Sequence, residues 1–255
     1  MNFELSDEQQ LLGDSLARLL QDQCSFEQRR TAAATEAGWN PQLWAQIAEL
    51  GVTALGIPEA LGGLGGGATG RLTSGQAFGR ALLLEPYLAS LLGSAAVQHA
   101  GSPAQQDALL PQLASGELLL SWAHDETAAR HAPLWVQTQA RRESDGWRLS
   151  GRKSLVLHAG AANRFIVTAR VSGQGSDEDG LALFVVDATA PGLSVRNFRL
   201  MDDTPAGELV LADVPAEPLG QAEDGARALA AIRATQAAGT AAACADMLGA
   251  MEAAF

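Results

Sequence analysis

Two stretches of the chain carry the side chains that could take part in chemistry. The first, LLLSWAHDETAARHAP, begins at Leu118, and it predicts a strand (Glu117 to His124) that breaks into a polar loop. The second, WRLSGRKSLVLHAGAANRF, begins at Trp147, and it predicts a hairpin arm that continues as an apolar strand. No histidine in either stretch has a partner at catalytic spacing. The residues alone therefore indicate where a site lies, but they give little information on its reaction.

Other reactive side chains point to structural roles. Glu126 lies in the polar loop, where a carboxylate is more often solvated than catalytic. Cys24 and Cys244 are the two cysteines, far apart in sequence and both in helical segments, and we expect two reduced, mostly buried thiols. The chain shows no disulfide framework and no metal-ligand spacing.

A glycine-rich run, GIPEALGGLGGG from Gly56 to Gly67, raises the question of a phosphate-binding loop. Such a loop needs a strand before it and, in one common form, a lysine after it, and neither is present here. The run is better explained as a mobile or tightly turning connection.

Composition limits the class of protein. A chain of 255 residues with 47% hydrophobic residues can build a sizeable core in one large domain or two. The net charge of −12 argues against nucleic acid or an anionic membrane as a partner, although a small basic pocket could still hold an anionic ligand. The acidic start, MNFELSDEQQ, is unlike a signal peptide, and no apolar run approaches a membrane span of about 18 residues. We expect a soluble cytoplasmic protein.

The first part of the chain predicts helices. Ser6 and Gln9 form a capping box, and leucines follow at helical spacing. A short helix is expected over Phe26 to Ala34, and Asn40 with Pro41 starts another that ends at Gly51. Further helices are predicted from Arg71 to Leu84, from Pro86 to His99, and after a second capping box at Ser102 and Gln105, with Gly116 as the end. Residues 1–116 are predicted to form an N-terminal helical domain.

Residues 117–220 change to a strand period and are predicted to form a β-barrel or sandwich. Turn signals such as SDG at Ser144 to Gly146 separate the strands, and runs such as RFIVTARV and LALFVVD are apolar on both faces. After the first strand, the strands are predicted at Leu134–Arg141, Trp147–Ser150, Lys153–His158, Phe165–Val171, Leu181–Asp187, Leu193–Arg196 and Glu208–Ala212.

Residues 221–255 are alanine-rich and predict the first helix of a C-terminal helical bundle. A lone helix of about 30 small residues has little to stabilise it, so we expect the other bundle members in a longer chain or in another subunit. The predicted fold class is therefore α+β: helical domain, β-barrel domain, and the start of a helical bundle.

Several stretches in this order resemble the acyl-CoA dehydrogenase family. FELSDEQQLLGDSLARLL is similar to its opening helix, and WAQIAELGVTALGIPEALGGLGG to its ELGLLGLxVPEExGGLG stretch. GWRLSGRKSLVLHAGAANRFIVTAR resembles GWxLxGxKxxITNGxxADxxxVxAR, and GLALFVVDATAPGLSV resembles GxxxFLVxxxxPGxSV. The phrases AFGRALLLEPYLAS and VLHAGAANRFIVTAR look closest to the small subunit of pimeloyl-CoA dehydrogenase-type enzymes.

The resemblance implies α,β-dehydrogenation of an acyl-CoA thioester with FAD as the cofactor. A glutamate base removes the α proton while hydride passes to the flavin N5, and hydrogen bonds to the thioester carbonyl stabilise the transition state. The family's base lies in the later bundle, so no catalytic residue is assigned in this chain. The implied substrate is a dicarboxylic or bulky acyl-CoA, and the implied acceptor is of the electron-transfer flavoprotein type. A homo- or hetero-oligomer, dimer or tetramer, is expected.

The resemblance also places cofactor contacts in the first stretch, where the family has a loop of the type TEPxAGSD. Trp122 takes the aromatic position at the ring edge, His124 the next strand position facing the ring, and Asp125 the flavin-contacting threonine. Arg130 and His131 stand where glycine and serine approach the flavin and the thioester. His131 is thus the candidate substrate contact. Ordinary solvated loop residues are an equal alternative for Arg130 and His131.

In the second stretch the family has WIT or FVT as a flavin wall, and here it is Leu155, Val156 and Leu157. Leu155 and Leu157 are the candidate cofactor contacts, with the loss of one polar contact worth about 1 kcal/mol. His158 stands where the family has asparagine. The prediction requires that the segments around Trp122 and Leu155 meet as one face of a cleft.

The altered loop and wall keep two alternatives open. One is a non-catalytic partner subunit of a heteromeric acyl-CoA dehydrogenase, which would shape a site together with another chain. The other is a CoA-thioester binding module without redox chemistry. In the family the adenine and pyrophosphate arm of FAD is held largely by the bundle and a neighbouring subunit, which leaves open whether this chain binds FAD alone.

Overall fold

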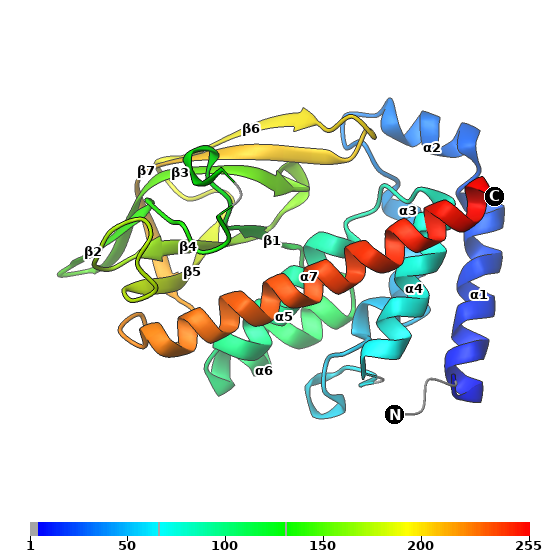
Figure 1. The fold of residues 1–255 in the computed structure, drawn as a ribbon, viewed down its shortest axis with the longest axis horizontal. Helices are drawn as coiled ribbons and strands as arrows, with labels where there is room; N and C mark the ends of the chain where they lie inside the picture. Colours follow the sequence, from blue (N-terminus) through cyan, green and yellow to red (C-terminus); the bar gives the residue numbers. More distant parts are fainter. Residues whose placement is uncertain (1–4, 66, 131) are drawn as a thin grey trace.

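The computed structural model describes residues 5–65, 67–130 and 132–255. Figure 1 shows two parts: a β-sheet block on one side and a group of helices on the other, with the last helix, α7, running along both. Among the described residues, no helix has both the length and the apolar character that crossing a membrane requires.

Three helices open the helical part. They are α1 (Asp7–Gln23), α2 (Phe26–Ala33) and α3 (Pro41–Glu49). The predicted Ser6 capping box is present, and Asn40 caps α3 with Pro41 in the first turn. Ser25 forms a further capping box, which the sequence analysis did not use. Local side-chain chemistry therefore sets where these helices begin.

The glycine-rich connection forms a compact turn between helices. It contains the short 3₁₀ turn η2 (Glu59–Leu61) and follows another, η1 (Val52–Ala54), and Leu55 pairs with Gly65. A Cβ on Gly63 would lie 2.0 Å from the carbonyl oxygen of Ile57, so only glycine fits this approach. The tightly turning connection expected from the sequence is confirmed.

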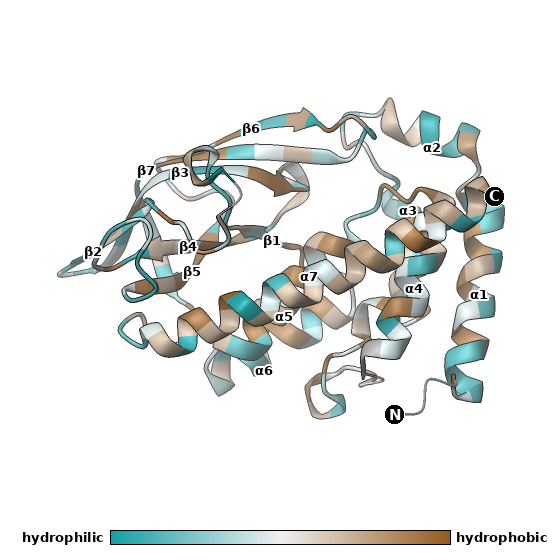
Figure 2. Ribbon diagram, viewed as in Figure 1, coloured by the Kyte–Doolittle hydropathy of each residue, from teal (hydrophilic) through white to brown (hydrophobic). Residues whose placement is uncertain are grey.

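The next helices are α4 (Gly67–Ala81), α5 (Tyr87–Ala100) and α6 (Pro103–Ala114), the last with the predicted Ser102 capping box. Helix α7 (Gly225–Ala254) packs against α4 and α5. Figure 2 shows α7 coloured mainly from pale to brown, with isolated teal residues, as its alanine-rich sequence requires. Toward its C-terminal end, α7 exposes Met247, Leu248, Met251 and Phe255.

Within the described part of the chain, seven strands form the sheet block. They are β1 (Leu120–Ala123), β2 (Gln139–Glu143), β3 (Gly146–Leu157), β4 (Arg164–Arg170), β5 (Leu181–Asp187), β6 (Leu193–Arg199) and β7 (Pro205–Pro218). Strands β4, β2, β3, β7 and β5 follow one another as hydrogen-bonded neighbours, and β5 pairs back with β4. This closed ring is the predicted barrel. Strand β1 adds to β4 in parallel, and β6 adds to β7.

Strand β4 shows why its sequence is apolar on both faces. Phe165 and Val167 belong to the cluster that fills the barrel, while Ile166 belongs to a second cluster shared with α5, α6 and α7. Strand β5 alternates in the same way, with Phe184 inside the barrel and Leu183 toward the helices. The barrel is therefore fastened to the helices by side chains of its own strands.

Three details differ from the sequence analysis. The two strands predicted over Trp147–Ser150 and Lys153–His158 are one long strand, β3, whose pairing with β7 is interrupted by irregularities. The second strand begins at Gln139 rather than Leu134. Cys24 is buried, but Cys244 is exposed on α7, so the expectation of two buried thiols is wrong for Cys244. The proposed limits of the three domains stay a prediction.

Candidate functional site

The two chemistry-bearing segments meet in the structure. The main-chain N–H of Ser154 on β3 donates a hydrogen bond of 2.8 Å to the main-chain oxygen of Asp125, just after β1. This contact places the loop after Trp122 directly beside the residue that precedes Leu155. The predicted meeting of the two segments is confirmed, while the cleft that they would line for a flavin stays a prediction.

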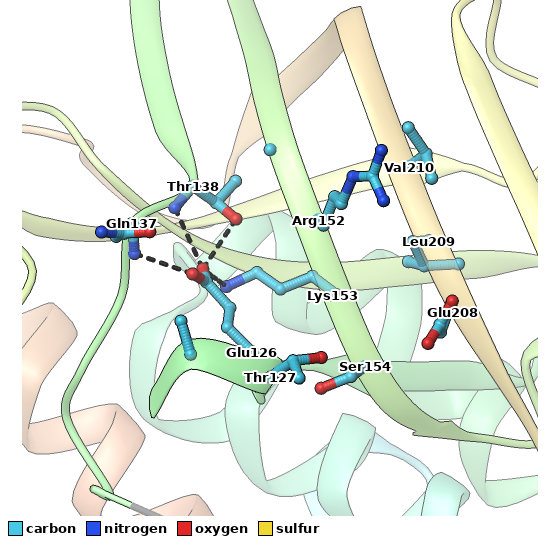
Figure 3. Close-up of a pocket in the computed structure, with 12 residues that line it drawn as sticks. Glu126, Thr127, Gln137, Thr138, Arg152, Lys153, Ser154, Glu208, Leu209 and Val210 are labelled. Atoms are coloured by element: carbon cyan, nitrogen blue, oxygen red, sulfur yellow. Dashed lines mark hydrogen bonds and ion pairs between the residues drawn. The ribbon is translucent and has the colours of Figure 1, made fainter. Parts of the chain in front are cut away.

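A buried ion pair lies beneath this contact. The ammonium of Lys153 is 2.8 Å from the Oε1 atom of Glu126, and the lysine is 1% exposed. The backbone N–H groups of Gln137 and Thr138 and the Thr138 hydroxyl donate to the same carboxylate, at 2.9, 3.0 and 2.7 Å. Figure 3 shows Lys153 and Gln137 approaching the Glu126 carboxylate from opposite sides, with Thr138 above it. The interpretation of Glu126 as a solvated loop carboxylate is therefore wrong.

Lys153 has all three of its donors matched. Besides Glu126, its ammonium donates to the main-chain oxygen of His124 and to the hydroxyl of Thr168 on β4, each at 3.0 Å. An ammonium carries three donors and no acceptor, so this arrangement satisfies it completely. The group joins β3, β4 and the loop after β1 at one point.

The surroundings shift both pKa values of the pair. Burial raises the pKa of Glu126, but the Lys153 charge and the donors of Thr138 outweigh burial, and the pKa of Glu126 lies below its usual range. Burial lowers the pKa of Lys153 to about 8, although the Glu126 carboxylate works in the opposite direction. At neutral pH both groups are charged, and the pair is a fixed structural contact rather than a free base.

His124 is held inside the same network. Its Nδ1 lies 3.0 Å from the Thr168 hydroxyl and its Nε2 lies 2.8 Å from the main-chain oxygen of Pro133. Because Thr168 accepts from Lys153, its hydrogen is available for Nδ1, and Nε2–H then donates to Pro133. Burial, followed by the nearby Lys153 charge, lowers the pKa of His124, which agrees with this neutral ring.

Trp122 lies above this network. Its half-buried indole is stacked on the His124 ring, with centroids 5.5 Å apart and an interplanar angle of 13°. His124 itself is 3% exposed, and its ring packs against one face of the Trp122 ring. Trp122 therefore presents the accessible aromatic surface, and direct contact of His124 with a cofactor stays a prediction.

Leu155 is presented by an irregularity in β3. Its φ is 52°, in the left-handed region that few side chains adopt, and the pairing with β7 shifts register between Lys153 and Val156. The side chain is 49% exposed, next to the contact between Ser154 and Asp125. A half-exposed leucine in a strained conformation beside a polar loop suits an apolar wall for a ligand.

Leu157 and His158 lie at the end of β3 and border a cavity of about 380 Å³. His158 also has a left-handed φ, and its Nε2 lies 2.8 Å from the main-chain oxygen of Leu84. Its buried Nδ1 has no hydrogen-bond partner among the described residues. Burial lowers the pKa of His158 to about 4, so the ring is neutral and Nδ1 is an acceptor.

The same cavity is framed by α4, α7 and the turn between β6 and β7. Most of its lining is apolar, but four charged side chains also contribute. Burial raises the pKa of Glu85, and burial together with Asp202 raises that of Asp246. The one cation is Arg29, which bonds to the turn at Asp202 and Asp203. The apolar lining comprises Phe78, Leu82, Leu83, Leu88, Leu157, Leu200, Ala242, Ala243 and Met247.

The remaining predicted residues lie in the loop after β1. The side chains of Asp125 and Arg130 are exposed, and Arg130 has a left-handed φ of 47°. His131 lies outside the described residues, so its predicted substrate contact stays a prediction. The cofactor roles of Trp122, Asp125, Arg130, Leu155 and Leu157 are likewise not decided by their positions alone.

The sequence analysis missed Lys153. One signal was available, since Lys153 is the single lysine of the printed sequence, whereas every other basic side chain except histidine is arginine. It also coincides with the lysine of the family motif GWxLxGxKxxITNGxxADxxxVxAR, which the resemblance matched to this stretch.

Residues 6–117 match the family model described as acyl-CoA dehydrogenase, N-terminal domain, and residues 125–214 match acyl-CoA dehydrogenase, middle domain. The acyl-CoA dehydrogenase FadE27 of Mycobacterium tuberculosis is 29% identical over 196 residues, which is 76% of this chain and 50% of the relative. The chain spans about half the length of the curated relatives it matches.

Two solved structures are similar over nearly the whole chain. The Tcur3481–Tcur3483 steroid ACAD G363A variant has a TM-score of 0.84 at 30% identity, covering 97% of this chain and 64% of that one. The ChsE4–ChsE5 complex from Mycobacterium tuberculosis has a TM-score of 0.81 at 26% identity, covering 99% and 66%. The pimeloyl-CoA dehydrogenase-type small subunit suggested by the sequence is not confirmed by these matches and stays a prediction.

Proposed function

Because the chain belongs to the acyl-CoA dehydrogenase family through its N-terminal and middle domains, we propose that it serves in the α,β-dehydrogenation of an acyl-CoA thioester with FAD. The observation that supports this most is the hydrogen bond between Ser154 N–H and the Asp125 oxygen. It joins the two segments that the resemblance assigns to the flavin.

The residues present fit a flat, mostly apolar ring. Trp122 offers a half-buried indole, Leu155 a half-exposed leucine, and Leu157 an apolar side chain at the border of the cavity. The exposed Asp125 carboxylate and the Arg130 guanidinium in the same loop carry opposite charges and can bind polar edges of a ligand. When FAD is bound, its flavin accepts the hydride that leaves the substrate.

The cavity beside Leu157 is the proposed place of the acyl group. A volume of about 380 Å³ lies in the range of small-molecule sites. Glu85, Asp202 and Asp246 outnumber Arg29 among its charged side chains, which disfavours a second carboxylate on the substrate. Of the two substrate classes predicted from the sequence, we therefore propose the bulky, uncharged acyl-CoA.

We assign no catalytic base among the described residues. Glu126 is neutralised by Lys153, and the Glu85 carboxylate accepts from the backbone N–H groups of Asn40 and Leu84. The proposed acceptor for the electrons is a protein of the electron-transfer flavoprotein type.

A second candidate is a partner subunit in a two-chain acyl-CoA dehydrogenase. Two observations favour it: the similar ChsE4–ChsE5 structure is a complex, and α7 exposes apolar residues near its C-terminal end. Such a subunit would supply the barrel wall while another chain supplied the base and the rest of the cofactor site.

The absorption spectrum of the purified protein tests these proposals. We expect a flavin spectrum that is bleached when a bulky acyl-CoA is added anaerobically. A colourless protein that gains flavin only when co-expressed with a neighbouring acyl-CoA dehydrogenase chain would support the partner subunit. A protein that binds CoA thioesters without flavin in either setting would contradict both proposals and support a thioester-binding module.

A further inference from the structure

The buried lysine is connected to the proposed cofactor site through the main chain. Three successive residues, His124, Asp125 and Glu126, are bonded to two successive residues of β3. Lys153 holds the His124 oxygen at 3.0 Å and the Glu126 carboxylate at 2.8 Å, and Ser154 N–H holds the Asp125 oxygen at 2.8 Å. The loop after β1 is thus attached to β3 residue by residue, although β1 pairs with β4 as a strand.

Two of the candidate cofactor contacts, Asp125 and Leu155, lie within or next to this attachment. Asp125 stands between the two residues that Lys153 binds, and Leu155 follows Ser154 directly in the left-handed part of β3. The distance between the loop and the leucine wall is therefore set where the ammonium is bound. A change at that point would move both walls of the site relative to each other.

An ammonium suits the three acceptors at this position better than a guanidinium does. The donors must reach a main-chain oxygen, a carboxylate and a hydroxyl from one point, and a tetrahedral ammonium does so at 3.0, 2.8 and 3.0 Å. A guanidinium is planar and larger, and its donors point along a fork. The chain uses arginine for its other strong cations and lysine only here, where 1% of the residue is exposed.

We propose that Lys153 is a positioning residue, which fixes the His124–Glu126 loop on β3 and thereby sets the spacing between Asp125 and Leu155 in the cofactor site. The link to a cofactor depends on the function proposed above. The attachment of the loop itself does not, so the two can be tested separately.

The test separates the ammonium's hydrogen bonds from its charge. Lys153→Met alone leaves the Glu126 carboxylate buried without its cation, and we expect that variant to be less stable overall. The double variant Lys153→Met/Glu126→Gln removes both charges and should regain much of the stability. It still lacks the donor to the His124 oxygen, so the loop should stay loose.

Two measurements report on the loop. The first is trypsin cleavage after Arg130 in the native protein without added flavin, where we expect about tenfold faster cutting in the double variant than in the wild type. The second is the dissociation constant for FAD from a fluorescence titration, expected to rise about tenfold. Arg233→Met/Glu178→Gln is the matched control, because it removes an exposed ion pair of 2.7 Å between α7 and the loop that joins β4 to β5, and it should change neither value.

The outcomes are distinct. A double variant that regains stability and matches the wild type in both cleavage and FAD binding would overturn the proposal, because the pair would then be structural only. If the wild type binds no FAD, the proposed cofactor fails, while faster cleavage after Arg130 still supports the attachment of the loop.

A milder variant covers the case in which the double variant does not fold. Thr168→Val removes one of the three acceptors of the ammonium, together with the hydroxyl bonded to His124 Nδ1, and keeps both charges. We expect cleavage after Arg130 to accelerate by a few-fold in this variant. An unchanged rate would contradict the proposal.

Discussion

The two ends of the segment from Lys153 to His158 differ in how their buried polar groups are satisfied. At Lys153 every donor of the ammonium has an acceptor, and the opposing Glu126 carboxylate accepts from three further donors. At His158 one ring nitrogen is bonded to the Leu84 oxygen, and the other has no partner among the described residues. The first end borders the loop after β1, and the second borders the cavity framed by α4 and α7.

This difference distinguishes a group that holds the backbone in place from a group that can bind a ligand. A fully matched polar cluster has no capacity left for a ligand, and its effect is to hold backbone segments in place. A buried nitrogen with an unused lone pair, beside an apolar cavity, can still gain a hydrogen bond. This contrast agrees with the proposed positioning role at the Lys153 end and with the proposed acyl-group site at the His158 end of the segment.

We expect the largest effect on stability from removing the cation at the Lys153 end of the segment. Lys153→Met should lower the free energy of unfolding by about 3–5 kcal/mol, because it leaves a buried carboxylate uncompensated. Urea denaturation followed by circular dichroism measures the change. As a contrast, Arg233→Met breaks an ion pair whose two side chains are more than half exposed, and it should cost no more than about 1 kcal/mol. Equal losses of unfolding free energy in the two variants would mean that the Lys153 ammonium is not buried with all of its donors hydrogen-bonded.

The pKa of Lys153 can be measured by titration without overlap, because the printed sequence holds one lysine. Protein labelled with ¹³C-lysine should show a side-chain titration near the pKa of about 8, against 10.5 for an ordinary lysine. The groups that bear on Lys153 are Glu126, Asp125 and His124. By linkage, the cost of burying the ammonium is fully present below pH 8 and fades as the pH rises toward 10.5. A titration near 10.5 would rule out the buried position.

The second expected effect is a pH dependence of folding stability that arises at the His158 end of the segment. The folded state keeps His158 neutral down to a pKa of about 4, whereas the unfolded chain protonates it near 6.5. The unfolded state therefore binds the extra proton between these values, and stability falls as the pH drops through that window, by roughly 3 kcal/mol in all. His158→Asn should remove this loss, and asparagine also tolerates the left-handed φ.

Urea denaturation of both proteins between pH 7 and pH 4 makes the comparison. Glu85, Asp202, Asp246 and Arg29 border the same cavity. Their own titrations are present in both proteins and cancel in the difference. Parallel stability curves would show that His158 is accessible to protons in the folded state, which contradicts the buried ring.

A third effect concerns the helices that frame the cavity. A Cβ on Gly79 in α4 would lie 1.8 Å from the main-chain oxygen of Asp246, so Gly79→Ala must push α7 away. We expect a loss of about 1–3 kcal/mol and a change in acyl-CoA binding. Gly70→Ala in the same helix meets only ordinary contacts, the nearest at 3.5 Å, and should stabilise α4 by about 0.5–1 kcal/mol. A loss in both variants would point to helix α4 itself rather than to its crossing with α7.

Much of the fold followed from local signals in the sequence. Capping boxes at Ser6 and Ser102 and the cap at Asn40 placed helix starts correctly, because each is decided within a few residues. Apolar runs on both faces predicted strands buried on two sides, as β4 and β5 are. The closure of the ring between β4 and β5 and the place of β1 were not accessible from spacing, because these pairings are long-range.

The candidate site was predictable in position and only partly in chemistry. The family resemblance brought Trp122 and Leu155 together, and the structure confirms the contact of their segments. It gave no reason to pair Glu126 with Lys153, since 27 residues separate them and burial of the pair depends on the finished barrel. The left-handed φ of Leu155 was equally hidden, because an apolar run such as LVL predicts regular strand.

The smallest expected effect compares two leucines with the same backbone conformation. Leu155 and Leu82 both have a φ of 52°, and they are 49% and 50% exposed. Replacing either with glycine relieves left-handed strain of about 1–2 kcal/mol, offset by about 0.5–1 kcal/mol of added chain entropy in the unfolded state. Both variants should therefore gain no more than about 1.5 kcal/mol in urea denaturation. Only Leu155→Gly should also weaken FAD binding, because only Leu155 follows the residue bonded to the loop after β1. If Leu82→Gly weakened FAD binding as much, the cofactor wall would have to be sought at the end of α4 instead.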